Sequence, residues 1–492
     1  MIRKNIRCFI FLLLIPITIT AQPFKKRLTL HAVIDLAREQ SPRAMLAKHA
    51  FRASYWQYRS FSAGLLPNMY FNSTLPNLNR SFERITLPDG TDAFVERKLM
   101  TTNAEIFLSQ NIPFTGGNIF LESSLQRIDI FGAGEDKSYL STPVSIGFRQ
   151  PISAFNSYKW ESKIEPLKYE EARKNYISSL EEVALNAVEL FFDLAMAQLN
   201  LRIATINYSN ADTLYNISRG RYNIGTIAQN ELLQMELSLL NAGTALNDAK
   251  INLEMKKFSL RSFLGFNEQV EIELVIPDEL PVGDILFDKA YALALQNNPE
   301  LVNYKVQLAE AGKNLSKAKA EKGLNANMFA SFGLSKRADE FSNAYANPSD
   351  QQHLQLGIEF PILDWGMDKG RYKMAQSRQE IVKTQVEQAK SDFRQNVFLQ
   401  VTRFNLQDEQ VQIAAKADNV AQLRYDVTKH RFLIGKINVL DLNVALNEKD
   451  IAKRAYLQSL YTYWHFFYTI RNLTLYNFAS DQPLSEDFEE LL

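Results

Sequence analysis

Three long stretches of this 492-residue chain contain neither glycine nor proline. They are residues 167–219, 371–434 and 436–482, and they are rich in Gln, Asn, Lys and Glu. As helices rising 1.5 Å per residue, the first two would span on the order of 80–95 Å. Such helices are stable only when they pack lengthwise against partners. The sequence therefore predicts long helices with narrow apolar seams and wet outer faces.

The chain also repeats itself in two ordered blocks. A shift of 257 residues places Leu36, Ala37 and Pro42 on Leu293, Ala294 and Pro299. A shift of 210 residues places Pro151, Ile152, Arg221, Ile224 and Gly225 on Pro361, Ile362, Arg431, Ile434 and Gly435. Two blocks in one order with constant internal spacing indicate a duplication. The difference of 47 between the two shifts is the number of extra residues that the first copy carries between its blocks.

Each copy begins with a predicted pair of helices, followed by alternation. Thr29 can cap the first helix, and Ser41-Pro42 and Asn298-Pro299 begin the second helix of each pair, with proline at the first helical position. Apolar and polar residues then alternate over 144–149 and again over 353–360. This period is typical of a strand with one apolar and one polar face. A membrane strand and an ordinary soluble hairpin both fit it.

The long helices break at matched glycines. Gly225 and Gly435 each follow the pattern Arg-aromatic-x-Ile, and glycine just past a helix end is the usual left-handed cap. We therefore expect two long antiparallel helical hairpins with tight tips, over 157–264 and 367–478.

The next helix is expected to restart directly after each glycine. Thr226 with Gln229 is a predicted capping box, and Asn438 with Asp441 is a looser version of one.

Residues 1–21 are a predicted signal peptide. Basic residues precede an apolar run, and Ala21 is the small residue expected before a cleavage at Gln22. Cleavage one residue earlier and an uncleaved anchor are the alternatives, although the run is shorter than the roughly 20 residues a span needs. Cleavage would remove Cys8, the sole cysteine, and an exported chain without cysteine fits a bacterial envelope.

Composition excludes several classes of protein. Lys plus Arg equals Asp plus Glu, at 55 each. The chain therefore lacks the surplus of basic residues that is typical of nucleic-acid-binding proteins. The five histidines are scattered, and no nucleophile elbow or phosphate loop is present, so we expect no enzyme, no cofactor and no metal. Beyond residue 21 no stretch of about 20 apolar residues appears, so any membrane crossing must use strands.

Together these features resemble the TolC family of outer-membrane efflux proteins, over roughly residues 29–478. The resemblance rests on Leu65-Leu66-Pro67, on Gln150-Pro151-Ile152 and Phe360-Pro361-Ile362 where strand becomes helix, and on the two tips. It implies a mainly α fold with a membrane β-barrel portion. Strands from three protomers would close one outer-membrane barrel, and the long helical hairpins would form a periplasmic tunnel.

The expected organisation follows the duplication. A signal peptide (1–21) precedes a first repeat (22–264) with membrane strands over about 68–150 and the hairpin 157–264. A linker element (265–283) leads to a second repeat (284–478) with strands over about 326–360 and the hairpin 367–478, and an acidic C-terminal tail (479–492) ends the chain. The 47 extra residues depart from the family's usual pattern. They form either a further hairpin in the barrel or an extracellular flap.

The resemblance also implies a function. The chain would be the outer-membrane exit duct of a tripartite efflux system, a homotrimer in outer-membrane lipid with a helical extension into the periplasm. Its partners would be a periplasmic adaptor protein and an inner-membrane pump, and transport through it would be passive. The duct of a type I protein secretion system is the alternative within the class, and a coiled-coil envelope scaffold is the alternative from another class.

Two acidic residues occupy equivalent positions near the tips. Glu231 and Asp441 each lie six residues past the tip glycine. The family's periplasmic aperture is ringed by acidic side chains, which implies that this pair favours cations there. Alternatively, both only suit the positive start of a helix.

Three departures weaken the comparison at the aperture. Val444 replaces a second acidic position of the family, Phe432 lacks a hydroxyl, and Ile437 replaces an arginine found in some members.

The tips themselves resemble the family's surface for docking the adaptor. They consist of Ile224, Gly225 and Thr226 in the first copy and Ile434, Gly435 and Lys436 in the second. Simple helix termination is the alternative explanation.

Overall fold

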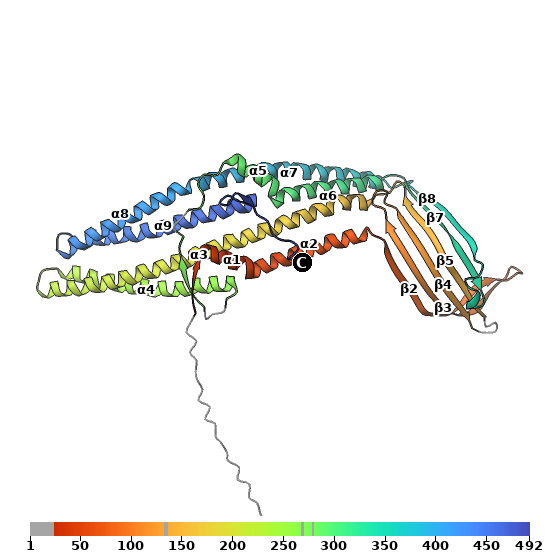
Figure 1. The fold of residues 1–492 in the computed structure, drawn as a ribbon, viewed down its shortest axis with the longest axis horizontal. Coiled ribbons are helices and arrows are strands. Elements are labelled where there is room, and N and C mark those ends of the chain that lie inside the picture. The colour runs from red at the N-terminus through yellow and green to blue at the C-terminus, as the bar shows by residue number, and fades with distance from the viewer. Residues whose placement is uncertain (1–23, 132–135, 267–269, 278–279) are drawn as a thin grey trace, which may run out of the picture. The chain divides into compact units, whose positions relative to one another are not determined.

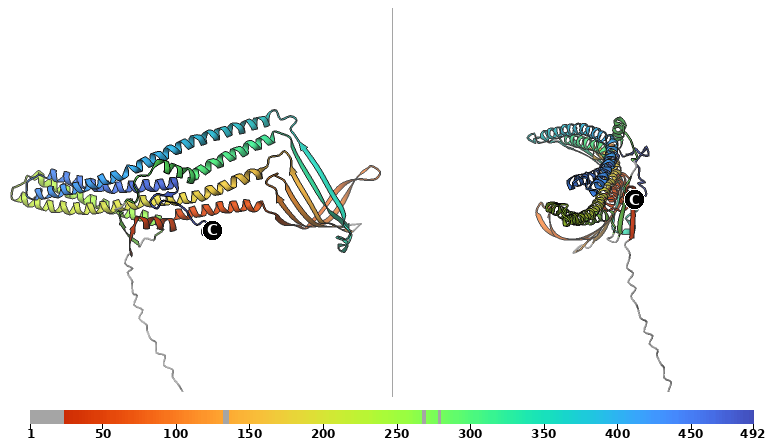
Figure 2. Two further views of the ribbon diagram at one scale, coloured as in Figure 1. Left: turned by 45° about the horizontal axis from the view of Figure 1, so that its top comes forward. Right: turned by 90° about the vertical axis from the view of Figure 1, so that its left-hand side faces the viewer.

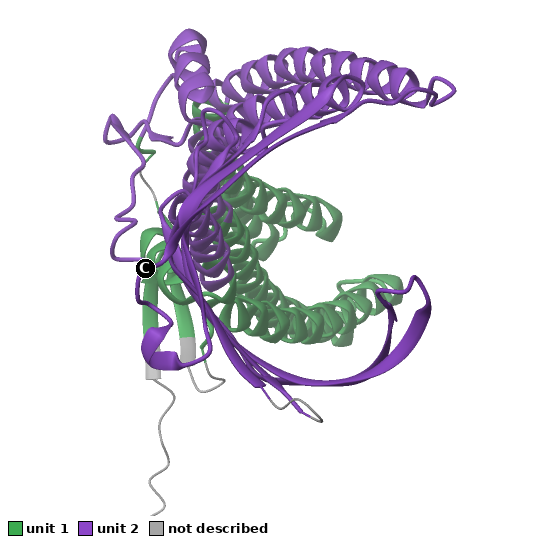
Figure 3. Ribbon diagram, turned by 90° about the vertical axis from the view of Figure 1, so that its right-hand side faces the viewer, with its two compact units in different colours: residues 1–44, 183–281, 407–465 green, residues 45–182, 282–406, 466–492 purple. Residues whose placement is uncertain are grey.

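The computed structural model describes residues 24–131, 136–266, 270–277 and 280–492, so the predicted signal peptide and Cys8 lie outside the described residues. The chain divides into two units, each built from three segments (Figure 3). Unit 1 comprises residues 1–44, 183–281 and 407–465, and unit 2 comprises residues 45–182, 282–406 and 466–492. Neither unit corresponds to one of the two sequence repeats.

Unit 2 contains a six-stranded antiparallel sheet (Figure 1). In spatial order its strands are β2 (Asn68–Thr86), β3 (Asp92–Asn111), β4 (Asn118–Ile130), β5 (Asp136–Pro151), β7 (Asn325–Ala338) and β8 (Ser349–Glu359). The strands predicted from alternation over 144–149 and 353–360 are therefore present. The first repeat contributes four strands and the second contributes two, and the sheet curves strongly (Figure 3).

The extra residues of the first repeat lie within residues 68–151, where the chain has two strands more than in the second repeat, and the first two strands of this region form the β2–β3 hairpin. This hairpin belongs to the sheet, because β3 pairs with β4 from Leu99 to Asn111. The far part of the hairpin extends past the end of β4 (Figure 2). Its turn contains Gly90 at φ +85°, and the turn that joins β3 to β4 contains Gly116 at φ +76°, a region that favours glycine.

The two faces of the sheet differ in character. One face carries large exposed apolar side chains on every strand: Met69, Phe71, Ile106, Leu121, Ile146, Phe332, Leu354, Leu356 and Ile358. The opposite face carries mainly polar ones, among them Asn72, Glu105, Glu122, Ser145, Ser331 and His353, around a stack of the Phe107, Phe120 and Phe329 rings. An exposed apolar face of this extent is a surface that faces lipid or another protein.

Four helical segments connect to the sheet in unit 2 (Figure 1), and one of them is the first part of α3 (Ser157–Asn223), which follows β5. Most of α2 (Pro42–Gly64) precedes β2, α5 (Phe287–Asn297) and α6 (Pro299–Glu321) precede β7, and α7 (Met367–Asn405) follows β8. A 3-10 turn, η1 (Phe341–Asn343), lies between β7 and β8, and a short ladder pairs β9 (Tyr476–Asn477) with β10 (Gln482–Pro483). The predicted helix starts are confirmed, since Ser41 Oγ accepts from Ala44 N–H and Asn298 Oδ1 accepts from Glu300 N–H.

Unit 1 is built from long helices. It contains α1 (Leu30–Gln40), the later part of α3 (Ser157–Asn223), α4 (Gln229–Leu264), α8 (Gln407–Leu433) and most of α9 (Val439–Thr474). Its core includes the fully buried side chains of Phe191, Leu194, Leu260, Leu264, Tyr463 and Trp464. No helix among the described residues is long and apolar enough to cross a membrane.

The linker element of the sequence analysis is part of a small sheet. Strand β6 (Val270–Val275) pairs in parallel with β1 (Phe24–Thr29), which the sequence analysis did not predict. Thr29 ends β1 and, as predicted, caps α1, because its hydroxyl accepts from Ala32 N–H.

The stretch 371–434 is not one helix, which corrects the simplest interpretation of its composition. Helix α7 ends at Asn405, and α8 starts at Gln407. The Asn405 side chain accepts from the backbone N–H of Ile285 and donates to its carbonyl, each at 3.0 Å. An extended segment far away in the sequence therefore engages the chain where the helix is interrupted. No glycine or proline marks the site.

The predicted acidic tail is docked in unit 2. Phe488 packs on the Phe51 ring at 5.1 Å, and the Arg173 guanidinium lies 4.4 Å from the centre of the Phe488 ring. Arg52 Nε donates to the carbonyl of Leu491 at 2.6 Å. An aromatic anchor and two arginines thus hold the tail on α2 and α3.

A buried ion pair joins α3 to α9 within unit 2. The Arg471 guanidinium donates two hydrogen bonds of 3.1 Å to the Glu181 carboxylate, and the two side chains are 9% and 2% exposed. Removing one partner from such a pair leaves a charge in a poorly solvated site.

We predict that Arg471→Met lowers the free energy of unfolding by about 3–5 kcal/mol, the usual cost of breaking a buried pair. The double variant Glu181→Leu/Arg471→Met should recover most of that loss, because no charge is then left buried. Denaturant unfolding of the purified variants measures both. Equal losses in the single and double variants would contradict this account.

Candidate functional site

The two helical tips of unit 1 have the same backbone geometry. After α3, Gly225 N–H donates to the Tyr222 carbonyl and Thr226 N–H donates to the Arg221 carbonyl, both at 2.9 Å. These are the two hydrogen bonds of a Schellman motif, and Gly225 has the left-handed φ of +73° that the motif requires.

After α8 the same motif recurs. Gly435 N–H donates to the Phe432 carbonyl at 2.9 Å, and Lys436 N–H donates to the Arg431 carbonyl at 3.0 Å. Gly435 has a φ of +74°. The predicted glycine caps are therefore confirmed in both repeats.

The helices that follow the two tips, α4 and α9, begin in different ways. Asn438 Oδ1 accepts from Asp441 N–H at 2.9 Å, which confirms the looser cap before α9. The predicted capping box at Thr226 and Gln229 is wrong, because α4 starts after Ala228 without a side-chain cap. The Thr226 hydroxyl instead donates to the Arg221 carbonyl at 2.9 Å, so it closes the end of α3.

One arginine connects the two tips. Arg221 Nη2 donates to the Leu433 carbonyl at 3.5 Å, and its guanidinium lies 5.9 Å from the centre of the Phe432 ring. Phe432 is buried in a cluster with Tyr425, Leu442 and Ala445. The arginine therefore supplies a donor to an otherwise open helix end and covers the apolar cluster with its planar head.

A hollow of about 400 Å³ lies between the tips. Glu231 lines it together with Arg221, Thr226 and Gln234 on one side and residues 435–440 on the other, except Lys436. Asp441 is exposed and follows that segment. The structure thus places Glu231 at the hollow and Asp441 beside it.

The tip residues named from the sequence are exposed. Ile224 and Ile434 have 75% and 66% of their surface accessible, although both are large and apolar. Gly225, Thr226, Gly435 and Lys436 are exposed as well. Each tip thus presents one large apolar side chain to solvent.

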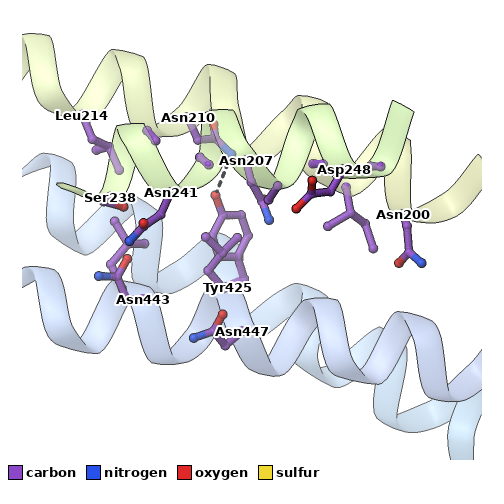
Figure 4. A pocket seen from close by; sticks show the side chains of 18 of the residues that line it. Asn200, Asn207, Asn210, Leu214, Ser238, Asn241, Asp248, Tyr425, Asn443 and Asn447 are labelled. Carbon is purple, nitrogen blue, oxygen red and sulfur yellow. Dashed lines mark hydrogen bonds between the residues drawn. The ribbon is translucent and has the colours of Figure 1, made fainter. Parts of the chain in front are cut away.

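A second, larger hollow follows the helices away from the tips (Figure 4). It has a volume of about 720 Å³, and seven asparagines line it: Asn200, Asn207, Asn210, Asn241, Asn252, Asn443 and Asn447. These side chains come from α3, α4 and α9, and Tyr425 of α8 reaches in among them.

Polar contacts connect the two helical hairpins beside this hollow. Asn210 Nδ2 donates to the Tyr425 hydroxyl at 3.2 Å, Lys429 Nζ donates to Asn210 Oδ1 at 3.3 Å, and Arg454 Nε donates to Asn200 Oδ1 at 2.8 Å. Burial raises the pKa of Tyr425, and Asp426 and Asp450 raise it further, so the phenol stays protonated.

Sequence reasoning missed Arg221 as a bridge and missed the asparagine-lined hollow. The matching positions of Arg221 and Arg431 in the two repeats were visible, whereas the contacts of Arg221 with Leu433 and Phe432 of the opposite hairpin were not. The asparagine content predicts wet outer faces, whereas several asparagines line the space between the hairpins. In the described part of the chain, no group of three or more His, Cys, Asp or Glu side chains could hold a metal ion.

Comparison with known proteins assigns the family. A sequence profile of the outer membrane efflux proteins matches residues 33–266 and 290–470. The chain belongs to this family. Membership confirms the resemblance drawn from the sequence and the predicted place in the outer membrane. No curated protein matches the chain significantly by sequence.

Solved structures show the same fold. The Campylobacter jejuni CmeC outer membrane channel aligns with a TM-score of 0.66 at 16% identity, over 94% of this chain and 88% of that one. The outer membrane protein VceC of Vibrio cholerae aligns at 0.63 and 12% identity, over 93% and 97%. The open state of the Neisseria gonorrhoeae MtrE outer membrane channel aligns at 0.59 and 15% identity, over 93% and 91%. The predicted fold class, long helical hairpins with a β portion, is confirmed.

Proposed function

We propose that this efflux-family protein is the outer-membrane exit duct of a tripartite efflux system. One observation carries the proposal: the sheet has an exposed apolar face on all six strands and a mainly polar opposite face. Such a sheet suits lipid on one side and a water-filled passage on the other. A coiled-coil scaffold gives no reason for this sheet.

The duct requires more than one copy of the chain. A sheet with free edges is not tolerated in hydrocarbon, because each unpaired N–H and C=O costs several kcal/mol there. The family resemblance implies three copies, whose sheets close one barrel and whose helical hairpins form a tunnel in the periplasm. Solute passes through passively, and an inner-membrane pump coupled through an adaptor protein supplies the energy.

The first experiment measures the molar mass of the mature protein by light scattering after extraction from membranes in detergent. We expect three chains per particle and insolubility without detergent, since the apolar face needs a lipid substitute. A monomer or dimer that is soluble without detergent would eliminate the duct and favour the scaffold.

We further propose that Glu231 and Asp441 form acidic rings at the periplasmic aperture. Three copies of each carboxylate around one axis attract cations and repel anions. Support comes from Glu231 lining the hollow between the tips and from the exposure of both side chains.

In a planar bilayer, Glu231→Gln/Asp441→Asn should lower the preference for K⁺ over Cl⁻. The loss should be large at 0.01 M salt and small at 1 M, because the Debye length falls from about 30 Å to about 3 Å. Glu236→Gln, an exposed acid on α4 that does not line the hollow, is the matched control. Unchanged selectivity in the double variant would return both acids to a role in starting their helices.

The exposed tips, residues 224–226 and 434–436, are proposed as the surface that docks the adaptor. A Cβ added at Gly435 meets nothing within 4 Å, so the space around this turn is open to a partner.

Gly435→Trp should abolish export while the trimer stays intact, and Gly435→Ala should retain most of it. Both variants carry the cost of the left-handed backbone, about 1–2 kcal/mol, but only tryptophan adds bulk. The readout is efflux of a fluorescent dye from cells that lack the chromosomal gene and carry each variant, compared with the wild-type protein, with trimer yield measured in parallel. Equal loss in both variants, or loss of the trimer, would indicate a folding role for the glycine instead.

A further inference from the structure

The outermost strands of the sheet, β2 and β8, are each paired on one side only within the described chain. Strand β2 is 19 residues long and β8 is 11 residues long. Both have exposed apolar side chains on the same face of the sheet: Met69, Phe71 and Leu75 on β2, and Leu354, Leu356 and Ile358 on β8. Two long edges with exposed apolar side chains of this kind are templates for further pairing.

The directions of the two edge strands allow them to pair with each other across copies. Every neighbouring pair in the sheet is antiparallel. With six strands, β8 therefore runs opposite to β2. A β8 edge placed beside the β2 edge of a second copy continues the antiparallel order without a break.

The ends of the strands show how far the sheet is staggered. A row of directly opposed residues crosses the sheet through Asn68, Ser109, Phe120, Gly147, Ser331 and His353. Strand β2 begins at this row, but β5 continues four residues past it, to Pro151, and β8 continues six residues past it, to Glu359. All of these ends lie on the side where the chain connects to helices.

This stagger corresponds to the strand tilt of a closed barrel. When the step from β8 to the β2 of another copy adds no further stagger, the six residues are spread over six strand-to-strand steps, which is one residue per strand, or about 3.3 Å along the chain for about 4.8 Å across it. The corresponding tilt is about 35°, within the range of closed barrels. The ratio of shear to strand number is the same as in an eight-stranded barrel of shear eight, whose tilt is about 36°.

We propose that β8 of one copy pairs with β2 of the next, with Glu359 opposite Asn68, so that three copies close a barrel of eighteen strands. This inference rests on the trimer of the proposed function and adds the strand count, the pairing and the register. The register keeps the strand ends level on the helical side. It also places Phe71 opposite Leu356 and Met69 opposite Ile358, so that the apolar residues of both strands share the outer face.

The β2–β3 hairpin is what sets this size. With only two strands in each repeat, as in the second repeat here, a copy would contribute four strands and three copies would contribute twelve. The hairpin raises the contribution to six. Barrels of 16–18 strands enclose an aqueous channel, whereas eight strands enclose little more than their own side chains.

The far part of the same hairpin lies outside this barrel wall. Between Arg80 and Arg97 it pairs only with itself, and it carries charges on both faces. Arg80 bonds Glu96 at 2.8 Å on one face, and Arg97 bonds Glu83 at 2.6 Å on the other. Because neither face suits lipid, this ribbon stands in water beyond the membrane.

Cysteine cross-linking between copies tests the pairing. All variants carry Cys8→Ser, which removes the sole native cysteine. The predicted pair is Phe71→Cys/Leu356→Cys, and the matched control, Phe71→Cys/Gln352→Cys, keeps the first cysteine and moves the second by four residues on the same face. Oxidation, or a short bifunctional thiol reagent, is applied to outer membranes, and covalent dimers and trimers are resolved on a denaturing gel.

We expect on the order of tenfold more covalent product from the predicted pair, because opposed Cβ atoms lie about 4.5–5.5 Å apart and the control is displaced by about 13 Å. A third variant, Leu121→Cys/Leu356→Cys, tests direct pairing of β8 with β4 of the next copy. Efficient cross-linking there would overturn the proposal, because the β2–β3 hairpin would then lie outside the ring.

Light scattering of the uncross-linked variants distinguishes a failure of the proposed strand pairing from a failure of the proposed trimer. An intact trimer without the predicted cross-link overturns the eighteen-stranded barrel and leaves the duct standing. Absence of the trimer defeats the proposed function itself.

Discussion

Backbone hydrogen bonding at the edges of a lipid-facing sheet is the constraint on which this architecture depends. In hydrocarbon no water can satisfy a free N–H or C=O, so a sheet must close on itself or on copies of itself. The chain has an exposed apolar face over six strands, with β2 and β8 as open edges. Taken alone it is therefore an incomplete structure. Its even number of strands, the apolar face that all six strands share and the staggered strand ends allow copies of the chain to close one barrel.

The ends of the helices also need hydrogen-bond partners for their backbone carbonyls, although these ends are exposed to water. Each hairpin tip satisfies its last carbonyls through a Schellman motif built on one glycine, and Arg221 donates to the Leu433 carbonyl from the opposite tip. Between the hairpins, amide side chains such as Asn210 replace a continuous apolar seam. Polar contacts across a hollow hold helices together less tightly than close-packed leucines do, because each is exchanged against hydrogen bonds to water. Such a seam suits helices that have to change their spacing.

Most of the fold could be predicted from the sequence because the signals for it are local. Glycine at 225 and 435, proline at 42 and 299 and the alternation over 353–360 each act through the backbone within a few residues. Two failures were contacts between distant segments: Asn405 meets Ile285 where the helix is interrupted, and β1 needs β6 as its partner. One failure was local, because the Thr226 hydroxyl bonds the Arg221 carbonyl although its spacing to Gln229 fits a capping box. At the candidate site the tips and Glu231 could be located, whereas the bridge made by Arg221 depends on how two hairpins face each other.

The uneven duplication has a consequence for how such chains can evolve. The first repeat carries one hairpin more than the second, and all six strands still alternate in direction. Inserting a hairpin adds two strands and leaves every later segment on the same side of the membrane. A single inserted strand would have carried the helices that follow to the opposite side of the membrane. Growth of this architecture is thus restricted to steps of two, and an insertion of that kind changes the circumference of the pore without any change to the rest of the topology.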